Sequence, residues 1–351
     1  MSSAFKKISL VLSIYNEESC IGNTLLKLKK YMRVNYPDCE YEFIVVDDGS
    51  TDNTVNVLEE MKKELPELIL CRHSINMGQG KGFQTAFDYV TGDVVLTLDA
   101  DLSYEEKYIG DMLTKLEETD ADIVIASAFL NKSKIINVPL SRRIMTICAN
   151  KLLAISSKMN VSAITCAVRA YRKSVLDILP LESHGMEINL EVILKAEMLG
   201  LHIEEIPAVL KWNKPSDGTT KRKKRRSYFN LIKSIFKYSF FSMLFNPSWI
   251  FILPQLILVP FFVIYAFSLG FTFFSGTINF MVNGMVWNYA VSNSLRNLYA
   301  TVPHGFIILL ASVVLSMLFF LAWFISAQNK FYFEQNHILL SRLLKDRNKT
   351  K

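Results

Sequence analysis

Short apolar runs alternate with longer segments of mixed polarity through the first hundred residues of the chain. Four runs rich in Val, Ile and Leu predict strands, at residues 8–14, 42–46, 68–72 and 94–98. Segments of helical character separate these runs and end near residues 33, 64 and 90. The first helix is expected to open at Asn16, with Glu17 and Glu18 in its first turn, where acidic side chains suit the helix dipole. Alternating strands and helices predict an α/β domain with a mostly parallel sheet.

Polar clusters follow the predicted strands, and ligands of parallel sheets bind beyond the carboxyl ends of the strands. The clusters are Tyr15-Asn16-Glu17, Asp47-Asp48, the glycine-rich segment 76–82, and Asp99 with Asp101. Two like charges spaced i and i+2 at the end of a buried strand are costly unless something compensates them, and a divalent cation often does. We therefore predict that Asp99 and Asp101 clamp a metal ion.

The second half of the chain has the pattern of a membrane protein. No Asp, Glu, Lys or Arg occurs between Lys237 and Arg296, or between Arg296 and Lys330. Each interval holds an apolar stretch of the roughly 20 residues that a spanning helix needs, at about 249–274 and 306–326. The connection between them is read as an interfacial helix, a re-entrant segment or a third weak span. We expect two spans, because a third would place the basic tail on the opposite side.

The formal net charge of +6 arises beside the predicted spans, in the run KRKKRR at 221–226 and in the tail after residue 341. This placement favours contact with anionic membrane lipids and argues against a nucleic-acid partner. Positive flanks predict that the N-terminal domain and the tail lie on the cytoplasmic side. Residues 227–245 read as an amphipathic helix in the headgroup layer. The five cysteines form no CxxC pair, which suits a reduced compartment without structural zinc.

Six segments, taken in order, resemble the family 2 glycosyltransferases, which have a nucleotide-sugar-binding fold of the GT-A type. They are SIYNEE at 13–18, VVDDGSTDNT at 45–54, NMGQGKG at 76–82, LDADLS at 98–103, RAYRKSVL at 169–176 and EIPAVLKW at 205–212. With the C-terminal spans added, the chain is similar to the polyprenyl-phosphate sugar synthases, the group of dolichol-phosphate mannose synthase and bactoprenol glucosyltransferase. The resemblance implies a GT-A domain at 1–220, followed by a basic amphipathic segment at 221–246, two spans at 247–327 and a basic tail at 328–351.

The resemblance also implies roles for matching residues. The donor nucleotide sugar would be bound by Ser13, Tyr15, Glu17, Asp47, Asp48, Gly78, Lys81 and Asp99. Asp99 and Asp101 would be the catalytic pair and would hold Mg²⁺ or Mn²⁺. The metal is needed because the nucleoside diphosphate gains negative charge as its bond to the sugar breaks.

The chain departs from the family at three acceptor positions. Ala128 and Ile147 stand where lipid-phosphate enzymes usually carry arginine, and Ala163 stands where aspartate is frequent. Arg142, Arg143 and Arg169 are the remaining candidates for an acceptor phosphate, with solvated surface charge as the alternative for each. A phosphate acceptor is already ionised and needs no strong general base, so the alanine at 163 favours it, whereas the missing arginines at 128 and 147 count against it.

Two further groups are open to more than one interpretation. Glu187 and Glu191 lie four residues apart on a helix predicted at 187–200, and they either serve the site or form a solvated face. His184 and Gly185 either border the acceptor pocket or cap that helix.

Together these patterns predict an inverting, metal-dependent glycosyltransferase of the hexosyltransferase class, integral to the membrane and multi-pass. It would move a hexose from a UDP- or GDP-linked donor to a polyprenyl phosphate. Another membrane lipid acceptor, or a catalytically silent scaffold of the same fold, is the alternative. The sequence does not decide the sugar, the nucleotide or whether the protein forms a homo-oligomer.

Overall fold

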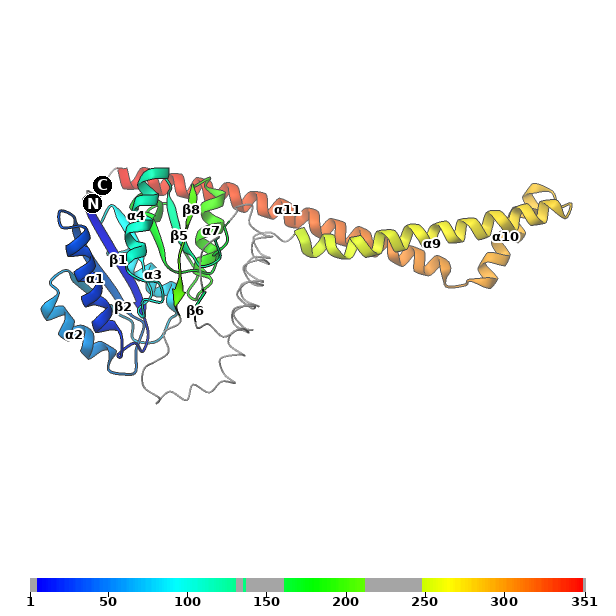
Figure 1. Ribbon diagram of the computed structural model, residues 1–351. Helices are drawn as coiled ribbons and strands as arrows, with labels where there is room; N and C mark the ends of the chain where they lie inside the picture. The colour runs from blue at the N-terminus through cyan, green and yellow to red at the C-terminus, as the bar shows by residue number, and fades with distance from the viewer. Residues whose placement is uncertain (1–4, 131–134, 137–160, 212–247, 350–351) are drawn as a thin grey trace. The chain divides into compact units, whose positions relative to one another are not determined.

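The computed structural model describes residues 5–130, 135–136, 161–211 and 248–349 (Figure 1). The chain divides into two compact units, one formed by Met1–Ser242 with Glu334–Lys351 and the other by Met243–Phe333. The predicted segments 221–226 and 227–245 lie outside the described residues. The predicted boundaries at 220, 246 and 327 therefore stay predictions.

A seven-stranded sheet forms the centre of the first unit, in the order β3-β2-β1-β4-β7-β5-β8. Its strands are β1 (Lys7–Ile14), β2 (Glu40–Asp47), β3 (Leu68–Arg72), β4 (Val94–Thr97), β5 (Ile123–Ser127), β7 (Arg169–Arg172) and β8 (Ile203–Pro207). Only β7 runs antiparallel to its neighbours in this sheet. A separate parallel pair joins β6 (Ile135–Ile136) to β9 (Leu210–Lys211). The predicted α/β class with a mostly parallel sheet is confirmed.

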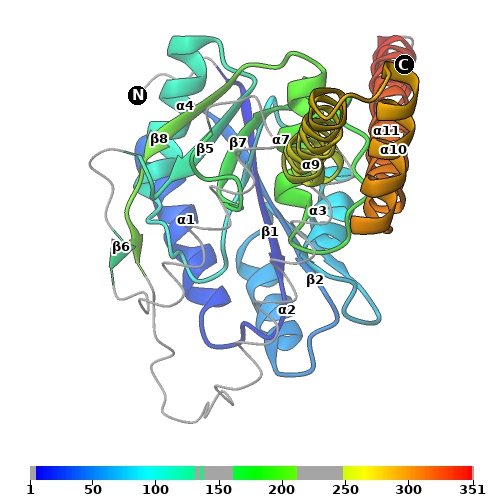
Figure 2. The same ribbon diagram turned by 90° about the vertical axis from the view of Figure 1, so that its right-hand side faces the viewer.

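Helices cover both faces of this sheet, with α1, α2 and α4 on one face and α3 and α7 on the other (Figure 2). Their bounds are α1 (Ile21–Asn35), α2 (Thr54–Glu64), α3 (Gln79–Phe87), α4 (Lys107–Thr119) and α7 (Ile188–Met198), with a short α6 (Lys173–Leu176) after β7. The core between α1, α4 and the strands is fully buried, as Leu25, Met112 and Leu96 illustrate. Burying each such side chain stabilises the fold by about 1.5–3 kcal/mol.

Strand register brings the predicted polar clusters to one edge of the sheet. Ile14 of β1 pairs with Asp47 of β2, and Val11 of β1 pairs with Thr97 of β4, all in parallel. The chain therefore leaves β1, β2 and β4 on the same side, as expected for the carboxyl ends of parallel strands.

The start of the first helix differs from the prediction. Helix α1 begins at Ile21 and has no acidic residue in its first turn. Asn16 instead has a positive φ of 56°, a conformation that asparagine tolerates better than most residues. Glu17 and Glu18 therefore belong to the loop after β1, since this turn redirects the chain before the helix can begin.

The second unit contains two helices of membrane-spanning character. The apolar parts of α9 (Ser248–Val282) and α11 (Gly305–Lys349) are long enough to cross a bilayer and are only 6% and 11% buried by protein. Both predicted spans fall within them, and Pro254 and Pro260 lie inside α9. Gln255 of α9 donates to the carbonyl of Ser316 in α11, and the Ser316 hydroxyl donates back, each at 2.6 Å. This mutual pair satisfies polar groups that would be costly in lipid.

The connection between these helices contains a third helix, α10 (Trp287–Thr301). Its 15 residues correspond to about 22 Å, less than the roughly 30 Å of a hydrocarbon core. Its buried positions Ala290, Ser294 and Leu298 form one stripe, and Ser294 packs against Gly276 of α9. Helix α10 is thus too short for the third span that the sequence left open.

Candidate functional site

Three carboxylates gather where β1 and β4 end. Burial, then the charges of Asp101 and Glu17, raise the pKa of Asp99 from 3.8 to about 7. Asp101 accepts hydrogen bonds from the backbone N–H and hydroxyl of Ser103, at 2.9 and 2.5 Å, which fix the turn after β4. The structure thus brings together Glu17, Asp99 and Asp101, which the sequence assigned to one site.

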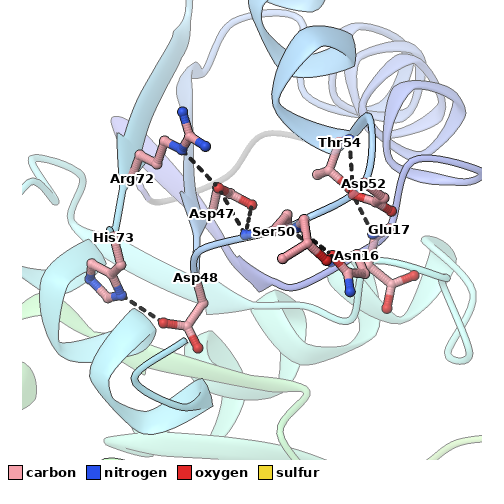
Figure 3. A network of polar contacts seen from close by, with 10 residues as sticks. Asn16, Glu17, Asp47, Asp48, Ser50, Asp52, Thr54, Arg72 and His73 are labelled. Atoms are coloured by element: carbon pink, nitrogen blue, oxygen red, sulfur yellow. Dashed lines mark hydrogen bonds and ion pairs between the residues drawn. The ribbon is translucent and has the colours of Figure 1, made fainter. Parts of the chain in front are cut away.

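The loop after β1 is held by the loop after β2 (Figure 3). The backbone N–H of Glu17 donates to the Thr54 hydroxyl at 2.9 Å, and the N–H of Asn16 donates to the Ser50 hydroxyl at 2.9 Å. The Tyr15 side chain is 43% exposed at this edge. An exposed aromatic ring beside a fixed loop is available for stacking against a planar ligand.

Glu17 has a second contact that sequence reasoning missed. The Cys20 thiol donates to Glu17 Oε2 at 3.3 Å. Burial and this hydrogen bond raise the pKa of the Cys20 thiol to about 12, so the thiol stays protonated and acts as a donor. It holds one oxygen of the Glu17 carboxylate, whose charge acts on Asp99.

The adjacent aspartates after β2 have different surroundings (Figure 3). Asp47 is fully buried, accepts the backbone N–H of Ser50 at 3.3 Å and lies 3.5 Å from Arg72 Nε. Asp48 accepts the backbone N–H groups of Met77 and Gly78, at 2.9 and 2.7 Å, and pairs with His73 at 2.7 Å. Asp48 therefore anchors the glycine-rich segment, a structural role that its predicted assignment to donor binding did not include.

The glycine-rich segment 76–82 opens α3 and packs against the segment 180–185. The Lys81 backbone N–H donates to the His184 carbonyl at 3.0 Å. A Cβ at Gly78, whose φ is +99°, would stand 2.4 Å from that carbonyl oxygen, and a Cβ at Gly80 would stand 2.2 Å from the Ser183 carbonyl oxygen. The two backbones therefore touch directly. His184 therefore borders the predicted donor loop. The sequence had suggested a place beside the acceptor pocket or at the start of the helix, and neither included this contact.

Replacing Gly80 by alanine is expected to destabilise the first unit by about 1 to 3 kcal/mol, because the added methyl overlaps two backbone oxygens. Those oxygens belong to Ser183 and Gly185 and cannot move without parting the two segments. Gly22→Ala is the control, since its nearest contact is a side-chain methyl of Val57 at 3.3 Å. Calorimetric unfolding of both variants measures the difference. Equal stability of Gly80→Ala and Gly22→Ala would contradict the direct contact.

The structure does not bring the three acceptor candidates together as it does the acidic residues of the predicted donor site. Arg142 and Arg143 lie outside the described residues, as does Ile147. Arg169 is fully buried, so the alternative of solvated surface charge is wrong for it. Its guanidinium donates to the carbonyls of Cys166, Ile164 and Asn189, each at 2.8 Å. Arg169 thus joins β7 to α7, and its contact with an acceptor phosphate stays a prediction that this burial disfavours.

The two alanines at altered family positions are buried. Ala128 is 5% and Ala163 1% exposed. The backbone N–H groups of Ser162 and Ala163 donate to Glu205, each at 2.9 Å. Glu205, in β8, therefore fixes the backbone at the position where family members frequently carry aspartate.

Of the two alternatives for Glu187 and Glu191, a solvated helix face is wrong for Glu191. Helix α7 begins at Ile188, with Glu187 as its N-cap residue, and Glu191 is 1% exposed. Glu191 pairs with Lys195 at 2.6 Å and accepts two backbone N–H groups of the segment 180–185. Residues 188–196 of α7 are all buried, so the charge of Glu191 has to be paired there. The spacing of four residues gave no signal of this burial, because it is equally common on solvated helices.

A divalent cation fits the chemistry of the acidic cluster. Within the described part of the chain, no group of three or more His, Cys, Asp or Glu side chains is placed to hold a metal ion by itself. Magnesium, however, is commonly held by one or two carboxylates together with the phosphates of a substrate. Burial, and after it the negative charges of Asp101 and Glu17, raise the pKa of Asp99, and a cation would neutralise those charges. Asp99 and Asp101 could therefore bind a metal ion whose remaining ligands are supplied by a diphosphate.

Residues 9–179 match the family model described as glycosyl transferase family 2. The match begins in β1, contains the acidic cluster and the glycine-rich segment, and ends after α6. The chain therefore carries a glycosyltransferase domain of this family, and the expected GT-A architecture is confirmed.

Three curated relatives are similar to this chain. Dodecaprenyl-phosphate galacturonate synthase of Rhizobium johnstonii is 31% identical over 171 residues, 48% of this chain and 49% of the relative. Dolichyl-phosphate beta-glucosyltransferase of Trichomonas vaginalis is 27% identical over 215 residues, 59% and 65% of the two chains. Undecaprenyl-phosphate 4-deoxy-4-formamido-L-arabinose transferase of Shewanella sediminis is 30% identical over 181 residues, 50% and 51%. The chain thus spans about half to two thirds of the length of these relatives.

Proposed function

We propose that this protein transfers a sugar from a nucleotide donor to a polyprenyl phosphate at a membrane surface. The observation that carries the proposal is the cluster of Glu17, Asp99 and Asp101 at the carboxyl edge of the sheet, in a chain with two long apolar helices. The three relatives are named for three different sugars but share a prenyl-phosphate acceptor. The acceptor class is therefore the part of the proposal with the broadest support.

The donor would lie across the ends of β1, β2 and β4. Tyr15 and the buried Asp47 would hold the base and ribose, and the glycine-rich segment with Lys81 would lie along the diphosphate. Asp99 and Asp101 would hold Mg²⁺ or Mn²⁺, which supplies positive charge to the departing diphosphate. Glu17, oriented by Cys20, completes the acidic wall of this site.

The chemical step would be a single displacement with inversion at the sugar C1. A phosphate oxygen of the acceptor forms the new bond to C1 as the bond to the nucleoside diphosphate breaks, and the electron pair leaves with the diphosphate. The acceptor oxygen is already ionised at neutral pH, so no side chain has to remove a proton. The buried Ala163, in place of an aspartate, is compatible with this reaction.

We also propose that the catalytic unit faces the cytoplasm and that the protein crosses the membrane twice. The support is the position of the basic residues at 221–226 and after residue 341, which flank the two apolar helices. Anionic lipids would then hold the site close to the acceptor headgroup.

The test uses the purified full chain with Mn²⁺, a set of radiolabelled UDP- and GDP-sugars, and two matched acceptors. Polyprenyl phosphate is expected to yield a lipid product that is labile in mild acid, and the corresponding polyprenol, which has only a hydroxyl, is expected to yield none. An acid-stable product formed with polyprenol or diacylglycerol, and none with polyprenyl phosphate, would identify a hydroxyl acceptor and overturn the proposal.

A further inference from the structure

Helix α7 contains a charged pair with almost no exposure to solvent. Glu191 and Lys195 have side chains that are 1% and 5% exposed, and Glu191 Oε1 lies 2.6 Å from Lys195 Nζ. The charges of both residues also act on His337 of α11, in the part of that helix that belongs to the same unit. Removing two charges from water is expensive, and an apolar pair of similar volume often stabilises a fold as well or better. Stability alone therefore does not explain why a charged pair occupies these two buried positions.

The pair holds the segment 180–185 through its backbone. Glu191 Oε1 accepts the N–H of Glu182 at 3.0 Å, and Oε2 accepts the N–H of Ser183 at 2.8 Å. Lys195 Nζ donates to the carbonyl of Pro180. An apolar pair would provide none of these three bonds, so the charges determine where this segment lies.

The same segment presses directly on the glycine-rich segment 76–82. Its carbonyls accept the backbone N–H of Lys81, at 3.0 Å, and the Gln84 side-chain amide, at 2.9 Å. Because Gly78 and Gly80 leave no room for even a Cβ between the two backbones, a shift of one segment must shift the other. On its opposite side the glycine-rich segment is tied to Asp48.

We propose that Glu191 and Lys195 are positioning residues for the donor site. They fix the position of the glycine-rich segment through the segment 180–185, and that position determines how tightly residues 76–82 bind the donor diphosphate. This rests on the proposed function, in which residues 76–82 bind the nucleotide sugar. Both side chains bind the segment 180–185, and their effect on the donor loop passes through that segment.

The test compares Glu191→Gln with Asp177→Asn in the full-length protein. A glutamine side chain has a single accepting oxygen, so it can replace only one of the two carboxylate oxygens that hold backbone N–H groups. Asp177 is the acidic member of another i,i+4 pair, with Lys173, and is about one third exposed. Glu191→Gln is expected to speed hydrogen exchange at the Lys81 amide and to weaken binding of UDP or GDP with Mn²⁺ about tenfold. Asp177→Asn is expected to change neither.

In steady-state transfer, Glu191→Gln is expected to raise KM for the nucleotide sugar by the same factor, with kcat and KM for polyprenyl phosphate unchanged. Gln84→Ala removes the side-chain link to the Ser183 carbonyl and also the contact of Gln84 Oε1 with Lys81 Nζ, at 3.5 Å. It is expected to act in the same direction by about threefold, and faster hydrogen exchange at the Lys81 amide, which the Nζ contact does not hold, is the result that supports the positioning role. Gln84→Ala serves as the second variant if Glu191→Gln does not fold. Lys195→Arg, which keeps the charge and a donor, is expected to retain wild-type nucleotide affinity.

Unchanged nucleotide affinity and unchanged Lys81 exchange in a folded Glu191→Gln protein would overturn the positioning role. So would a fall in kcat accompanied by an equal rise in KM for both substrates, because that pattern indicates a general loss of structure. Failure of the proposed function looks different, because wild type would then bind neither UDP nor GDP. In that case the Lys81 exchange rate still decides whether Glu191 holds the glycine-rich segment.

Discussion

Replacing Asp101 by asparagine is expected to reduce sugar transfer at least about 100-fold while leaving the fold intact. The side-chain oxygen of asparagine can still accept the Ser103 N–H, which Asp101 accepts at 2.9 Å, so the turn after β4 should persist. The variant loses the negative charge that we assign to metal binding. Transfer rates at rising Mn²⁺ concentration measure the effect, and excess metal should restore activity only partly.

Asp88→Asn is the matched control, because Asp88 is an exposed carboxylate at the end of α3 and undergoes the same chemical change. It is expected to keep wild-type activity and metal dependence. If Asp101→Asn were as active as Asp88→Asn at every Mn²⁺ concentration, the metal assignment to this cluster would be wrong. A large drop in the unfolding temperature of Asp101→Asn would instead indicate that the turn had been lost.

Asp99→Asn is expected to make the metal-free protein more stable at about pH 8, by roughly 1 to 3 kcal/mol. The pKa of Asp99 rises from 3.8 to about 7 through burial and the charges of Asp101 and Glu17. A carboxyl group with a raised folded-state pKa weakens folding above its unfolded value, because the folded protein holds a proton that the unfolded chain releases. The cost grows from about pH 4 to about pH 7 and is constant above that.

The difference between Asp99→Asn and wild type should therefore vanish near pH 4 and be largest above about pH 7. Unfolding in the presence of EDTA at several pH values measures it. Added Mn²⁺ should stabilise wild type more at about pH 8 than at about pH 6, because protons compete for Asp99, and should hardly affect the variant. A stability difference that is independent of pH would contradict a carboxyl group titrating in this cluster.

Much of the fold and half of the site were accessible from the chain alone. The apolar runs identified β1 to β4 because a strand buried on both faces leaves a nearly continuous hydrophobic pattern. The carboxyl-edge rule then placed Glu17, Asp99 and Asp101 together without knowledge of the contacts between them. The two long apolar helices were equally recognisable, because an apolar stretch of about 20 residues stands out in any sequence and has the length that a spanning helix needs.

Tertiary structure was needed for every residue whose role depends on what packs against it. The sequence showed Arg169 as a motif arginine, but its carbonyl partners, two in the stretch just before β7 and one in α7, make it part of the core. Asp48 looked equivalent to Asp47, yet only the return of the chain after β3 gives it two backbone N–H groups to hold.

The same distinction separates the residues that we assign to the donor site from those that we propose to position it. Local pattern was sufficient for Asp99 and Asp101, because two carboxylates at the end of a buried strand are unusual wherever they occur. It was insufficient for Glu191 and Lys195, whose i,i+4 spacing is ordinary on any solvated helix. Glu191 and Lys195 hold the segment 180–185 because both are buried. Burial is a property of the assembled fold, in which segments about a hundred residues apart in the sequence come into contact, as Lys81 and His184 do.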